Sequence, residues 1–387
     1  MKKVCVVTGT RAEYGLLKPI IEKIYKSNDL ELQLAVTGMH LSDEFGLTYH
    51  EIEEDGYPIH IKIDMHLDSD TPAGITKSMG IALLGFADYF ETDRPDIVVI
   101  LGDRYEIFMA ASAAMIAGIP IAHIHGGEKT EGAVDEAIRH SVTKMSHLHF
   151  AATEMYRKRI IQLGEDPSTV YNVGALGVEN VRSVKLLNKK ALEESLDFKF
   201  TDQTIMVTYH PVTLEIMTAG KQFQNLLDVV DRHKELSVII TKANSDTDGR
   251  IINRMIDEFA AGNSDRCKAY TSLGQVRYLS ALQFCTAVMG NSSSGMIEVP
   301  SFHIPTINIG DRQRGRICAE SVINCKNSVG EIENALQKAL SSEFRSSIAD
   351  VINPYEKAGT SAAIVEILQD ALNKGIDLKK TFYDIIL

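Results

Sequence analysis

Short apolar runs alternate with stretches of helical periodicity in the first half of the chain. The apolar runs are rich in valine, isoleucine and leucine, as in buried strands, and cover residues 3–7, 32–36, 97–101 and 120–124. Between them, apolar residues recur at helical spacing over residues 13–26, 76–90 and 106–117. Such alternation predicts a parallel sheet that is covered by helices on both faces.

A second series of the same kind follows the polar, lysine-rich stretch 185–199. Its predicted strands are residues 204–209, 238–242, 287–289 and 305–309, and its predicted helices are residues 223–233, 251–260 and 328–340. We therefore predict an α/β protein of two Rossmann-like domains joined near residues 178–190. The first domain is residues 1–180, with final helices at about 360–387 packing back on it, and the second is residues 181–360.

Composition narrows the class of protein. The 387 residues are enough for two cores, and 44% hydrophobic with 24% charged residues is typical of a soluble globular protein. No uncharged apolar stretch reaches the roughly 18 residues of a membrane-spanning helix, so we expect no membrane partner. The net charge of −12 argues against nucleic acid as a partner. The cysteines are scattered without a C-x-x-C pair, which favours a reducing, cytoplasmic location: Cys5, Cys267, Cys285, Cys318 and Cys325.

Residues with chemical potential gather in the turns that follow the predicted strands. In doubly wound sheets, ligands bind beyond the carboxyl ends of the strands, so these turns are the expected site. The turns are Thr8-Gly9-Thr10-Arg11, Thr37-Gly38-Met39-His40, Gly102-Asp103-Arg104, His123-Ile124-His125-Gly126-Gly127-Glu128, His210-Pro211, Gly290-Asn291-Ser292-Ser293-Ser294-Gly295 and Gly310-Asp311-Arg312-Gln313.

The serine-rich turn 290–295, followed by the helical run 296–299, resembles an anion-binding helix start. Its hydroxyls and N–H groups would face a phosphate, and Arg11 would add a fixed charge. The alternative is a serine helix cap with no ligand. Neither G-x-G-x-x-G nor G-x-x-x-x-G-K-[ST] occurs, so the turn is not a dinucleotide or P-loop fingerprint.

Two further turns carry acid, base and imidazole groups. Asp103 and Arg104 are either a local ion pair or helix cap, or a proton-transfer carboxylate beside a pyrophosphate contact. The i, i+2 spacing of His123 and His125 predicts that both imidazoles lie on one strand face. With Glu128 they form either a zinc site or a general acid–base cluster.

Three other pairs of polar residues have structural interpretations. Asp135 and Arg139 share a helix face at i, i+4, as a surface pair or as part of the site. The repeat His147-x-His149 is interpreted as packing, and Asp246-x-Asp248 as a helix cap rather than a metal motif.

Taken in order, the segments TGTRAEYG, TGMH, GDRYE, HIHGGE, DEAIRH, HP, GNSSSGMIEVPSF and INIGDRQ resemble the UDP-N-acetylglucosamine 2-epimerase family. The resemblance covers nearly the whole chain. HIHGGEKTEG, followed by DEAIRHSVTKMSHLHF, is especially similar to the hydrolysing branch of bacterial sialic- and legionaminic-acid synthesis. It implies the two-domain GT-B architecture with a central cleft, no cofactor, no metal, and a homodimer or dimer-based tetramer.

The resemblance also implies roles for individual residues. Those implied for binding the UDP-sugar are Arg11, His40, Arg104, His210, Asn244, Asn291, Ser292, Ser293, Ser294, Glu298 and Arg312. Glu298 among them would bind the ribose. Those implied for catalysis are Asp103, His125, Glu128, Asp135, Arg139 and His210. Many relatives have Glu where this chain has His125, so the family's proton-transfer group is replaced either by His125 or by Glu128.

The implied reaction converts UDP-N-acetylglucosamine and water to N-acetylmannosamine and UDP, through elimination to a glycal and hydration. The same reaction on the 2,4-diacetamido-trideoxy analogue is the nearest alternative. Other classes that fit the motifs are a glycosyltransferase, a non-hydrolysing epimerase, a metal-dependent hydrolase built on His123, His125 and Glu128, and a non-catalytic sugar-nucleotide sensor.

Overall fold

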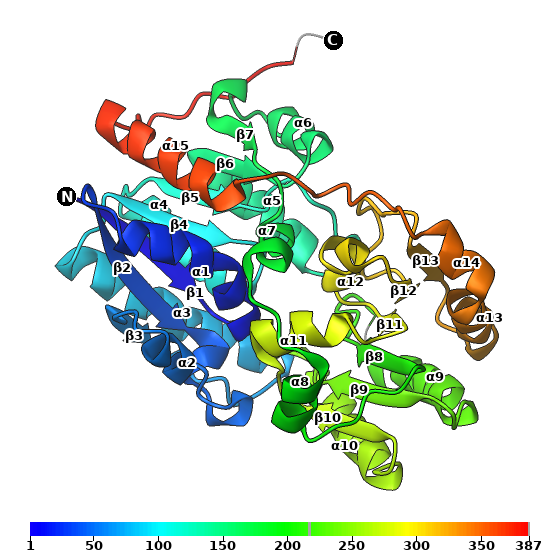
Figure 1. The fold of residues 1–387 in the computed structure, drawn as a ribbon. Coiled ribbons are helices and arrows are strands. Elements are labelled where there is room, and N and C mark those ends of the chain that lie inside the picture. Colours follow the sequence, from blue (N-terminus) through cyan, green and yellow to red (C-terminus); the bar gives the residue numbers. More distant parts are fainter. Residues whose placement is uncertain (216–217, 386–387) are drawn as a thin grey trace. The chain divides into compact units, whose positions relative to one another are not determined.

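The computed structural model describes residues 1–215 and 218–385, which form two compact α/β units (Figure 1). The first unit comprises Met1–Glu128, Asp135–Asn180 and Tyr355–Leu387. The second comprises Val181–Pro354 and, in addition, the six residues Lys129–Val134. The predicted α/β class is confirmed.

The first unit contains a seven-stranded sheet, as far as the described residues go, with the order β3-β2-β1-β4-β5-β6-β7. Every neighbouring pair is parallel. The strands are β1 (Lys2–Thr8), β2 (Leu30–Thr37), β3 (Ile61–Ile63), β4 (Ile97–Leu101), β5 (Ile121–Ile124), β6 (Leu148–Ala151) and β7 (Val170–Asn172).

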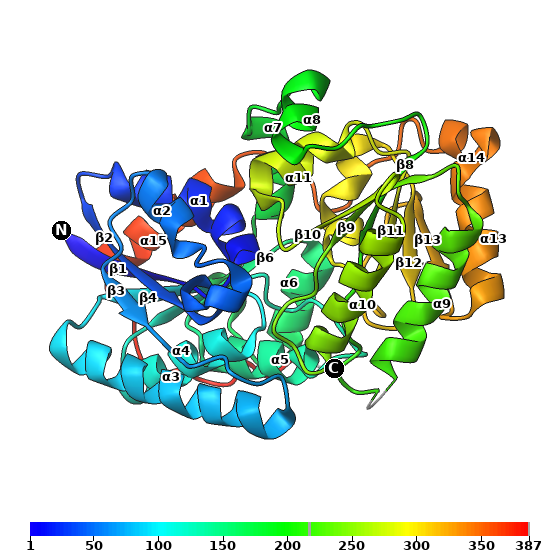
Figure 2. The same ribbon diagram turned by 90° about the horizontal axis from the view of Figure 1, so that it is seen from below.

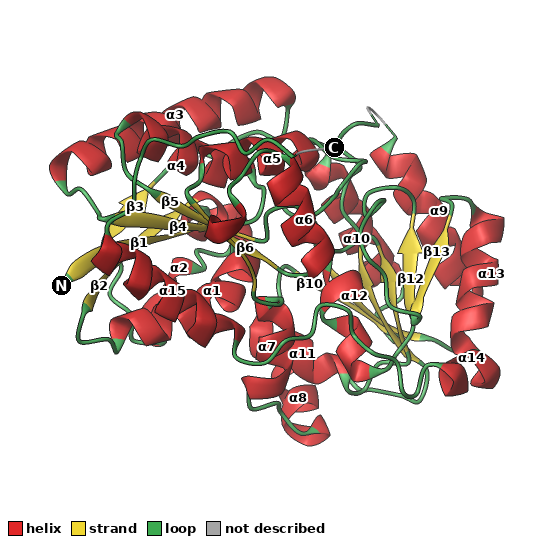
Figure 3. Ribbon diagram, turned by 90° about the horizontal axis from the view of Figure 1, so that it is seen from above, coloured by secondary structure: helices red, strands yellow, loops and turns green. Residues whose placement is uncertain are grey.

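Helices cover both faces of this sheet, as Figure 3 shows. Val4 and Val6 of β1 pack against α1 (Arg11–Tyr25) and α15 (Thr360–Lys374). The alternate residues Cys5 and Val7 pack on the other face, against α3 (Pro72–Thr92) and α4 (Tyr105–Ile116). The unit is completed by α2 (Tyr49–Glu54), α5 (Asp135–Met145), α6 (Glu154–Gln162) and 3-10 turns at Gly38–Leu41, Asp43–Phe45 and Pro167–Thr169. The helix α7 (Leu176–Ser183) begins in the first unit, and its residues from Val181 on belong to the second.

The second unit repeats the plan with a sheet of six described strands in the order β10-β9-β8-β11-β12-β13 (Figure 2). Its strands, all parallel to their neighbours, are β8 (Thr204–Thr208), β9 (Ser237–Thr241), β10 (Cys267–Tyr270), β11 (Ala287–Gly290), β12 (Thr306–Ile309) and β13 (Val322–Cys325).

Alternating residues of β8 again divide the second core. Ile205 and Val207 pack with α9 (Ala219–Arg232), α10 (Gly249–Gly262) and α13 (Val329–Leu340). Met206 faces α8 (Lys189–Leu196) and α11 (Gly274–Leu282). The remaining elements are α12 (Ser294–Ile297), a 3-10 turn at Val299–Phe302 and α14 (Ser342–Ser347).

Three details differ from the sequence prediction. The C-terminal helix ends at Lys374, and residues 375–385 continue without helix, while 386–387 lie outside the described residues. The run after the serine turn gives a single helical turn, Ser294–Ile297. Asp248 occupies the N-cap position of α10, as predicted, but it does so in a left-handed conformation and without a side-chain cap bond of its own. Among the described residues, no helix is both long and apolar enough to cross a membrane.

Candidate active site

In the first unit, the turns after β4 and β5 lie next to each other. The strands are in register with Leu101 opposite Ile124, and the N–H of Gly102 donates to the carbonyl of Ile124 at 3.0 Å. Asp103 and His125, the next residues of each chain segment, therefore leave the sheet at the same edge.

Arg139 on α5 joins these two turns. Its Nη1 donates to the carbonyl of His125 at 2.9 Å and lies 3.8 Å from Oε2 of Glu128. Its Nη2 pairs with Oδ2 of Asp103. Arg139 is buried, so the reading of this residue as part of a surface pair is wrong. One guanidinium thus holds the Asp103 carboxylate, the Glu128 carboxylate and the backbone of His125 in a fixed arrangement.

His123 and His125 do not share a strand face. His125 lies beyond the end of β5 with a φ of 65°, and its Nδ1 is 3.3 Å from Oε1 of Glu128. His123 stays in the strand, where its Nε2 donates to the carbonyl of Gly102 at 2.7 Å. Burial lowers the pKa of His123 to about 3, so its ring is neutral at working pH.

This arrangement argues against the alternative zinc site. Both ring nitrogens of His123 are engaged, one by the carbonyl of Gly102 and the other by the hydroxyl of Thr143. Within residues 1–215 and 218–385, no three His, Cys, Asp or Glu side chains are placed to share a metal ion. The metal-dependent hydrolase built on His123, His125 and Glu128 is therefore not supported by the geometry.

Two glutamates lie behind the turn after β1. Nε of Arg104 donates to Oε1 of Glu106 at 2.7 Å, and a side chain at Gly9 would collide with Glu106. The carboxylate of Glu13 accepts the N–H groups of Gly9 at 2.8 Å and Thr10 at 3.2 Å, within the capping box of α1. Burial, followed by the charge of Glu106, raises the pKa of Glu13 above its ordinary value.

Sequence reasoning missed both Glu13 and Glu106 as site residues. For Glu13 a signal was present, because Thr10-x-x-Glu13 is a capping-box pattern at the start of a helix. Glu106 lies inside the GDRYE segment, but its complete burial against Gly9 depends on the neighbouring strand and could not be read from spacing.

Arg11 and His40, two further candidates of the first unit, differ in how far their side chains are exposed to solvent. Nη2 of Arg11 pairs with Oε1 of Glu51 at 2.6 Å, and both side chains are partly exposed. His40 is fully buried, and its ring nitrogens bond to Thr8 at 3.0 Å and Thr48 at 2.8 Å. Burial lowers the pKa of His40 to about 4. Its geometry fits a support of the turn after β1 better than the predicted direct contact with substrate.

In the second unit, Asn291 connects three turns. Its side-chain amide makes a reciprocal pair of hydrogen bonds with the backbone of His210, at 2.7 and 2.8 Å. Its carbonyl accepts Nη1 of Arg312 at 3.2 Å and Nε2 of Gln313 at 2.8 Å. The turns after β8, β11 and β12 are thereby joined. Gln313 is buried and supports this turn, a role that the sequence motif did not predict.

The turn after β11 approaches β8 closely. Gly290 has a φ of 139°, and any Cβ there would collide with the carbonyl of Thr208, so glycine is required. The three serines that follow Gly290 make different contacts. Ser292 Oγ accepts the N–H of Ser294 at 3.4 Å, while the hydroxyl of Ser294 bonds to Tyr278 at 2.6 Å. Ser293 occupies the N-cap position of α12, without a side-chain cap bond.

His210 and Asn244 are in contact beyond the carboxyl ends of β8 and β9. The backbone N–H of Asn244 donates to Nδ1 of His210 at 3.5 Å, which leaves the proton of a neutral ring on Nε2. Glu298 lies half-buried directly after α12.

The predicted residues thus form two groups. In the first unit, Asp103, His125, Glu128 and Arg139 lie together, with Arg104 and Arg11 on neighbouring turns. Asp135 is the first residue of α5, the helix that carries Arg139. In the second unit, His210, Asn244, Asn291 and Arg312 lie together with the serine turn.

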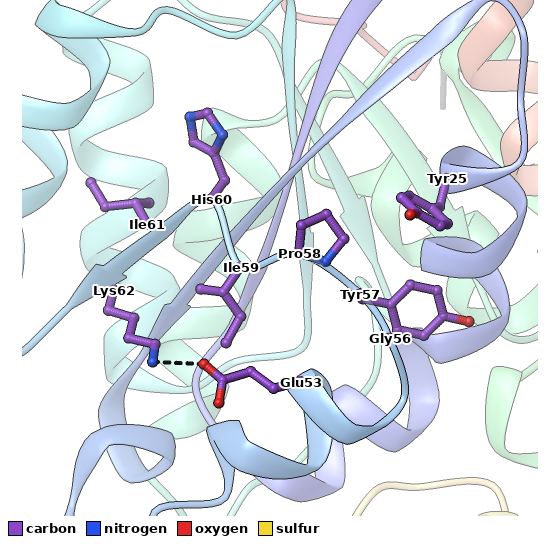
Figure 4. Close-up of a pocket in the computed structure, with 9 residues that line it drawn as sticks. All are labelled: Tyr25, Glu53, Gly56, Tyr57, Pro58, Ile59, His60, Ile61 and Lys62. Carbon is purple, nitrogen blue, oxygen red and sulfur yellow. Dashed lines mark hydrogen bonds and ion pairs between the residues drawn. The ribbon is translucent and has the colours of Figure 1, made fainter.

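A surface pocket of about 600 Å³ lies elsewhere in the first unit (Figure 4). It lies where β3 begins and α1 ends, at the amino side of the sheet. Its lining residues are Tyr25, Glu53, Gly56, Tyr57, Pro58, Ile59, His60, Ile61 and Lys62. Since none of them belongs to the strand-end turns, this pocket is not the candidate active site.

The fold and the strand-end clusters first define a class: an α/β protein whose candidate polar residues gather beyond the carboxyl ends of its parallel strands, where such folds bind their ligands. The model of the family described as UDP-N-acetylglucosamine 2-epimerase matches residues 22–369. The chain belongs to this family, which confirms the resemblance seen in the sequence motifs.

Two relatives and one solved structure show the range of similarity. The chain is 41% identical to the GDP/UDP-N,N'-diacetylbacillosamine 2-epimerase (hydrolyzing) of Campylobacter jejuni, over 99% of both chains. It is 40% identical to the polysialic acid biosynthesis protein P7 of Escherichia coli, over 100% of this chain and 98% of that protein. A crystal structure of UDP-GlcNAc 2-epimerase from Neisseria meningitidis bound to UDP-GlcNAc superimposes with a TM-score of 0.80 at 20% identity, covering 95% of this chain and 100% of the other. At that identity the structural likeness supports the fold alone.

Proposed function

We propose that this chain is a hydrolysing 2-epimerase that converts UDP-N-acetylglucosamine and water to N-acetylmannosamine and UDP. Membership of the 2-epimerase family supports the reaction at C2. The name of the Campylobacter relative supports hydrolysis, and the name of the Escherichia coli relative supports a role in supplying a sialic-acid-type sugar.

The chemistry requires two linked events. The C2 proton of an N-acetylhexosamine is weakly acidic because no carbonyl lies next to C2. Departure of UDP from C1 develops oxocarbenium character and makes that proton easier to remove. Loss of both gives a glycal with a C1–C2 double bond. Water then adds its hydroxyl to C1, and a proton returns to the opposite face of C2, which gives the manno sugar.

The first unit supplies acid–base groups for these steps. The Asp103 side chain is 19% exposed, whereas that of Glu128 is 1% exposed. Asp103 can therefore reach a substrate, and in the proposal it removes the C2 proton. Glu128 acts through His125, which would return a proton and activate water. Arg139 holds both carboxylates in place, and Asp135 lies at the start of its helix.

The second unit supplies groups for the leaving diphosphate. The proposal gives this role to His210, Ser292, Ser293 and Arg312, with Arg11 and Arg104 as further cations. Asn291 fixes the position of His210 and Arg312. Since α12 is a single turn, its dipole is small, and N–H groups and hydroxyls carry the stabilisation. Asn244, Ser294 and Glu298 complete the nucleotide site, with Glu298 on the ribose.

The observation that carries the proposal is the buried Arg139 between Asp103, Glu128 and His125. A protein that only binds UDP needs no such cluster, whereas proton transfer at C2 needs a positioned base and a positioned acid. Incubation with UDP-N-acetylglucosamine tests the proposal, with free UDP and released sugar as readouts. Formation of free UDP and N-acetylmannosamine in equal amounts is expected. UDP-N-acetylmannosamine without free UDP would indicate a non-hydrolysing epimerase instead.

A second candidate substrate follows from the relative at 41% identity. It is the UDP-linked 2,4-diacetamido-trideoxy sugar, on which the same elimination and hydration would act. The two substrates differ at C4 and C6, away from the reacting carbons. A parallel incubation distinguishes them through the ratio of kcat/KM values.

Assembly into a homodimer or dimer-based tetramer is a further prediction, which light scattering of the purified protein would test.

A further inference from the structure

Residues Lys129–Val134 connect two parts of the first unit but belong to the second unit. We call them the strap. The residue before the strap is Glu128, and the residue after it is Asp135, both candidates for catalysis. The strap is therefore the covalent link between these two residues.

One set of contacts attaches the strap to the turn after β12. Glu131 donates its N–H to the carbonyl of Arg314 at 3.3 Å and accepts Nε of Arg314 on its carboxylate at 3.1 Å. Nε of Arg316 donates to the carbonyl of Lys129 at 3.1 Å. A Cβ at Gly132 would stand 2.9 Å from the carbonyl oxygen of Asp311, so the strap lies directly against the backbone that precedes Arg312.

A second contact attaches the strap to the turn after β8. The N–H of Val134 donates to the hydroxyl of Thr213 at 3.0 Å. Thr213 follows His210 by three residues, and His210 is joined through Asn291 to Arg312. Both attachments of the strap thus lead to the turns proposed to hold the diphosphate.

We propose that the strap is a positioning element for the reaction: its attachment to the His210 and Arg312 turns sets the position of Glu128 and Asp135, so that diphosphate binding is transmitted to the acid–base groups. The inference rests on the proposed function. Consecutive Cα atoms are a fixed distance apart, so a shift of Val134 reaches Asp135 directly. Misplacement of a reacting group by about 1 Å can reduce turnover by roughly 10²-fold. The loss of a single bond that attaches the strap should therefore be measurable in kcat.

The first test removes one attachment without changing volume. Thr213→Val deletes the acceptor for the Val134 N–H, and Thr213→Ser restores it. The matched control is Thr286→Val, which deletes another hydroxyl bond of the second unit, to the carbonyl of Asp202 at 2.9 Å, at the amino end of β11. We expect Thr213→Val to lower kcat by about tenfold or more while UDP affinity in calorimetry stays within about twofold. Thr213→Ser and Thr286→Val should keep the wild-type kcat.

The second test moves the strap itself. Gly132→Ala places a methyl group against the Asp311 backbone and forces the strap away. Gly262→Ala is its control, since a Cβ there would meet no atom within 4 Å beyond its chain neighbours and the backbone of its own helix. Gly132→Ala should reduce kcat as Thr213→Val does, and Gly262→Ala should not.

A third readout does not depend on turnover. In hydrogen–deuterium exchange, UDP should slow exchange in peptides covering the strap and its flanks on both sides, and Thr213→Val should abolish this effect in the flanks. Wild-type kcat in both strap variants, or kcat and UDP affinity falling in parallel, would overturn the inference, as would flanks that do not respond to UDP in the wild type. Failure of the wild-type protein to release UDP from either UDP-sugar would overturn the proposed function instead, and the exchange result would still decide on the strap.

Discussion

The side-chain amide of Asn291 makes two reciprocal hydrogen bonds with the backbone of His210. Oδ1 accepts the N–H of His210 at 2.7 Å, and Nδ2 donates to its carbonyl at 2.8 Å. The amide is buried, so both bonds are protected from water. An aspartate in its place could satisfy only the N–H, because its second oxygen would face the carbonyl. The two bonds explain why an asparagine precedes the three serines of this turn.

Asn291→Ala should therefore destabilise the second unit and weaken UDP binding together. The backbone N–H and carbonyl of His210 would lose buried partners, at a cost of about 1–3 kcal/mol in the free energy of unfolding. Urea denaturation and calorimetry with UDP measure the two effects. Asn263→Ala is the matched control, since it removes an amide bonded to the carbonyl of Phe259 at the end of α10. It should lower stability with UDP affinity unchanged; equal losses of affinity in both variants would contradict the role of Asn291.

Arg11→Ala should weaken UDP binding by roughly 10- to 100-fold, because a charge-assisted hydrogen bond contributes about 1.5–3 kcal/mol. Arg11 lies on α1 and pairs with Glu51 on α2. Lys18 on α1 pairs with Asp55, at the end of α2, at 2.6 Å, so Lys18→Ala removes an equivalent ion pair away from the turn after β1. Calorimetry should show wild-type affinity in Lys18→Ala. The same affinity in Arg11→Ala would remove Arg11 from the site.

Asp103→Asn should reduce kcat by about 10²–10⁴-fold while UDP still binds, because the amide has the shape of the carboxylate but cannot take a proton. Asp93→Asn is a control in the same unit, where Asp93 pairs with Lys3 and His60 beyond the end of α3. Its turnover should match the wild type. Retention of normal kcat in Asp103→Asn would assign the base to another residue.

The ion cluster around the buried Glu165 predicts how the free energy of unfolding depends on pH. Glu165 accepts His149 at 3.0 Å, Lys144 at 2.5 Å and Lys380, from the C-terminal segment, at 2.7 Å. Burial opposes ionisation of Glu165, but these hydrogen bonds outweigh it and lower its pKa to about 2. Between pH 4.5 and 2 the unfolded chain binds more protons at this residue than the folded chain, so stability falls as the pH falls through this window.

Glu165→Gln should then lower the free energy of unfolding at pH 7 by about 3 kcal/mol and flatten its decline in acid. Denaturation by urea at a series of pH values measures both effects. Glu154→Gln removes an exposed carboxylate that pairs with Arg157 at 3.3 Å, and should change stability by less than about 1 kcal/mol. An unaltered acid slope in Glu165→Gln would show that other groups control it.

Periodicity was sufficient for the buried strands in the middle of each sheet. Predicted strands at 97–101, 204–209 and 287–289 coincide with β4, β8 and β11 within one residue at each end, because central strands of a parallel sheet are apolar throughout. No strand was predicted at β3, β7, β10 or β13. These have three or four residues each and mixed polarity, and they lie at or near the sheet edges, where one side of the strand needs no apolar run.

The candidate site shows the same limit. Strand-end turns identified where the chemistry should lie, but not which side chains meet. Asp135 and Arg139 were paired by helical spacing, whereas the guanidinium of Arg139 contacts Asp103 and Glu128, from two other turns. His149 was interpreted as packing, yet it is bonded to Glu165 in the fold. Such contacts depend on strand order and register, which no local spacing encodes.

The most direct measurement of the central claim follows hydrogen and oxygen at C2 and C1. The reaction is run with UDP-N-acetylglucosamine in D₂O and, separately, in ¹⁸O-labelled water. Elimination and hydration predict that the released N-acetylmannosamine carries deuterium at C2, and that ¹⁸O enters the sugar at C1 and not the UDP. A product that retains its original C2 hydrogen, or ¹⁸O found in UDP, would contradict the mechanism.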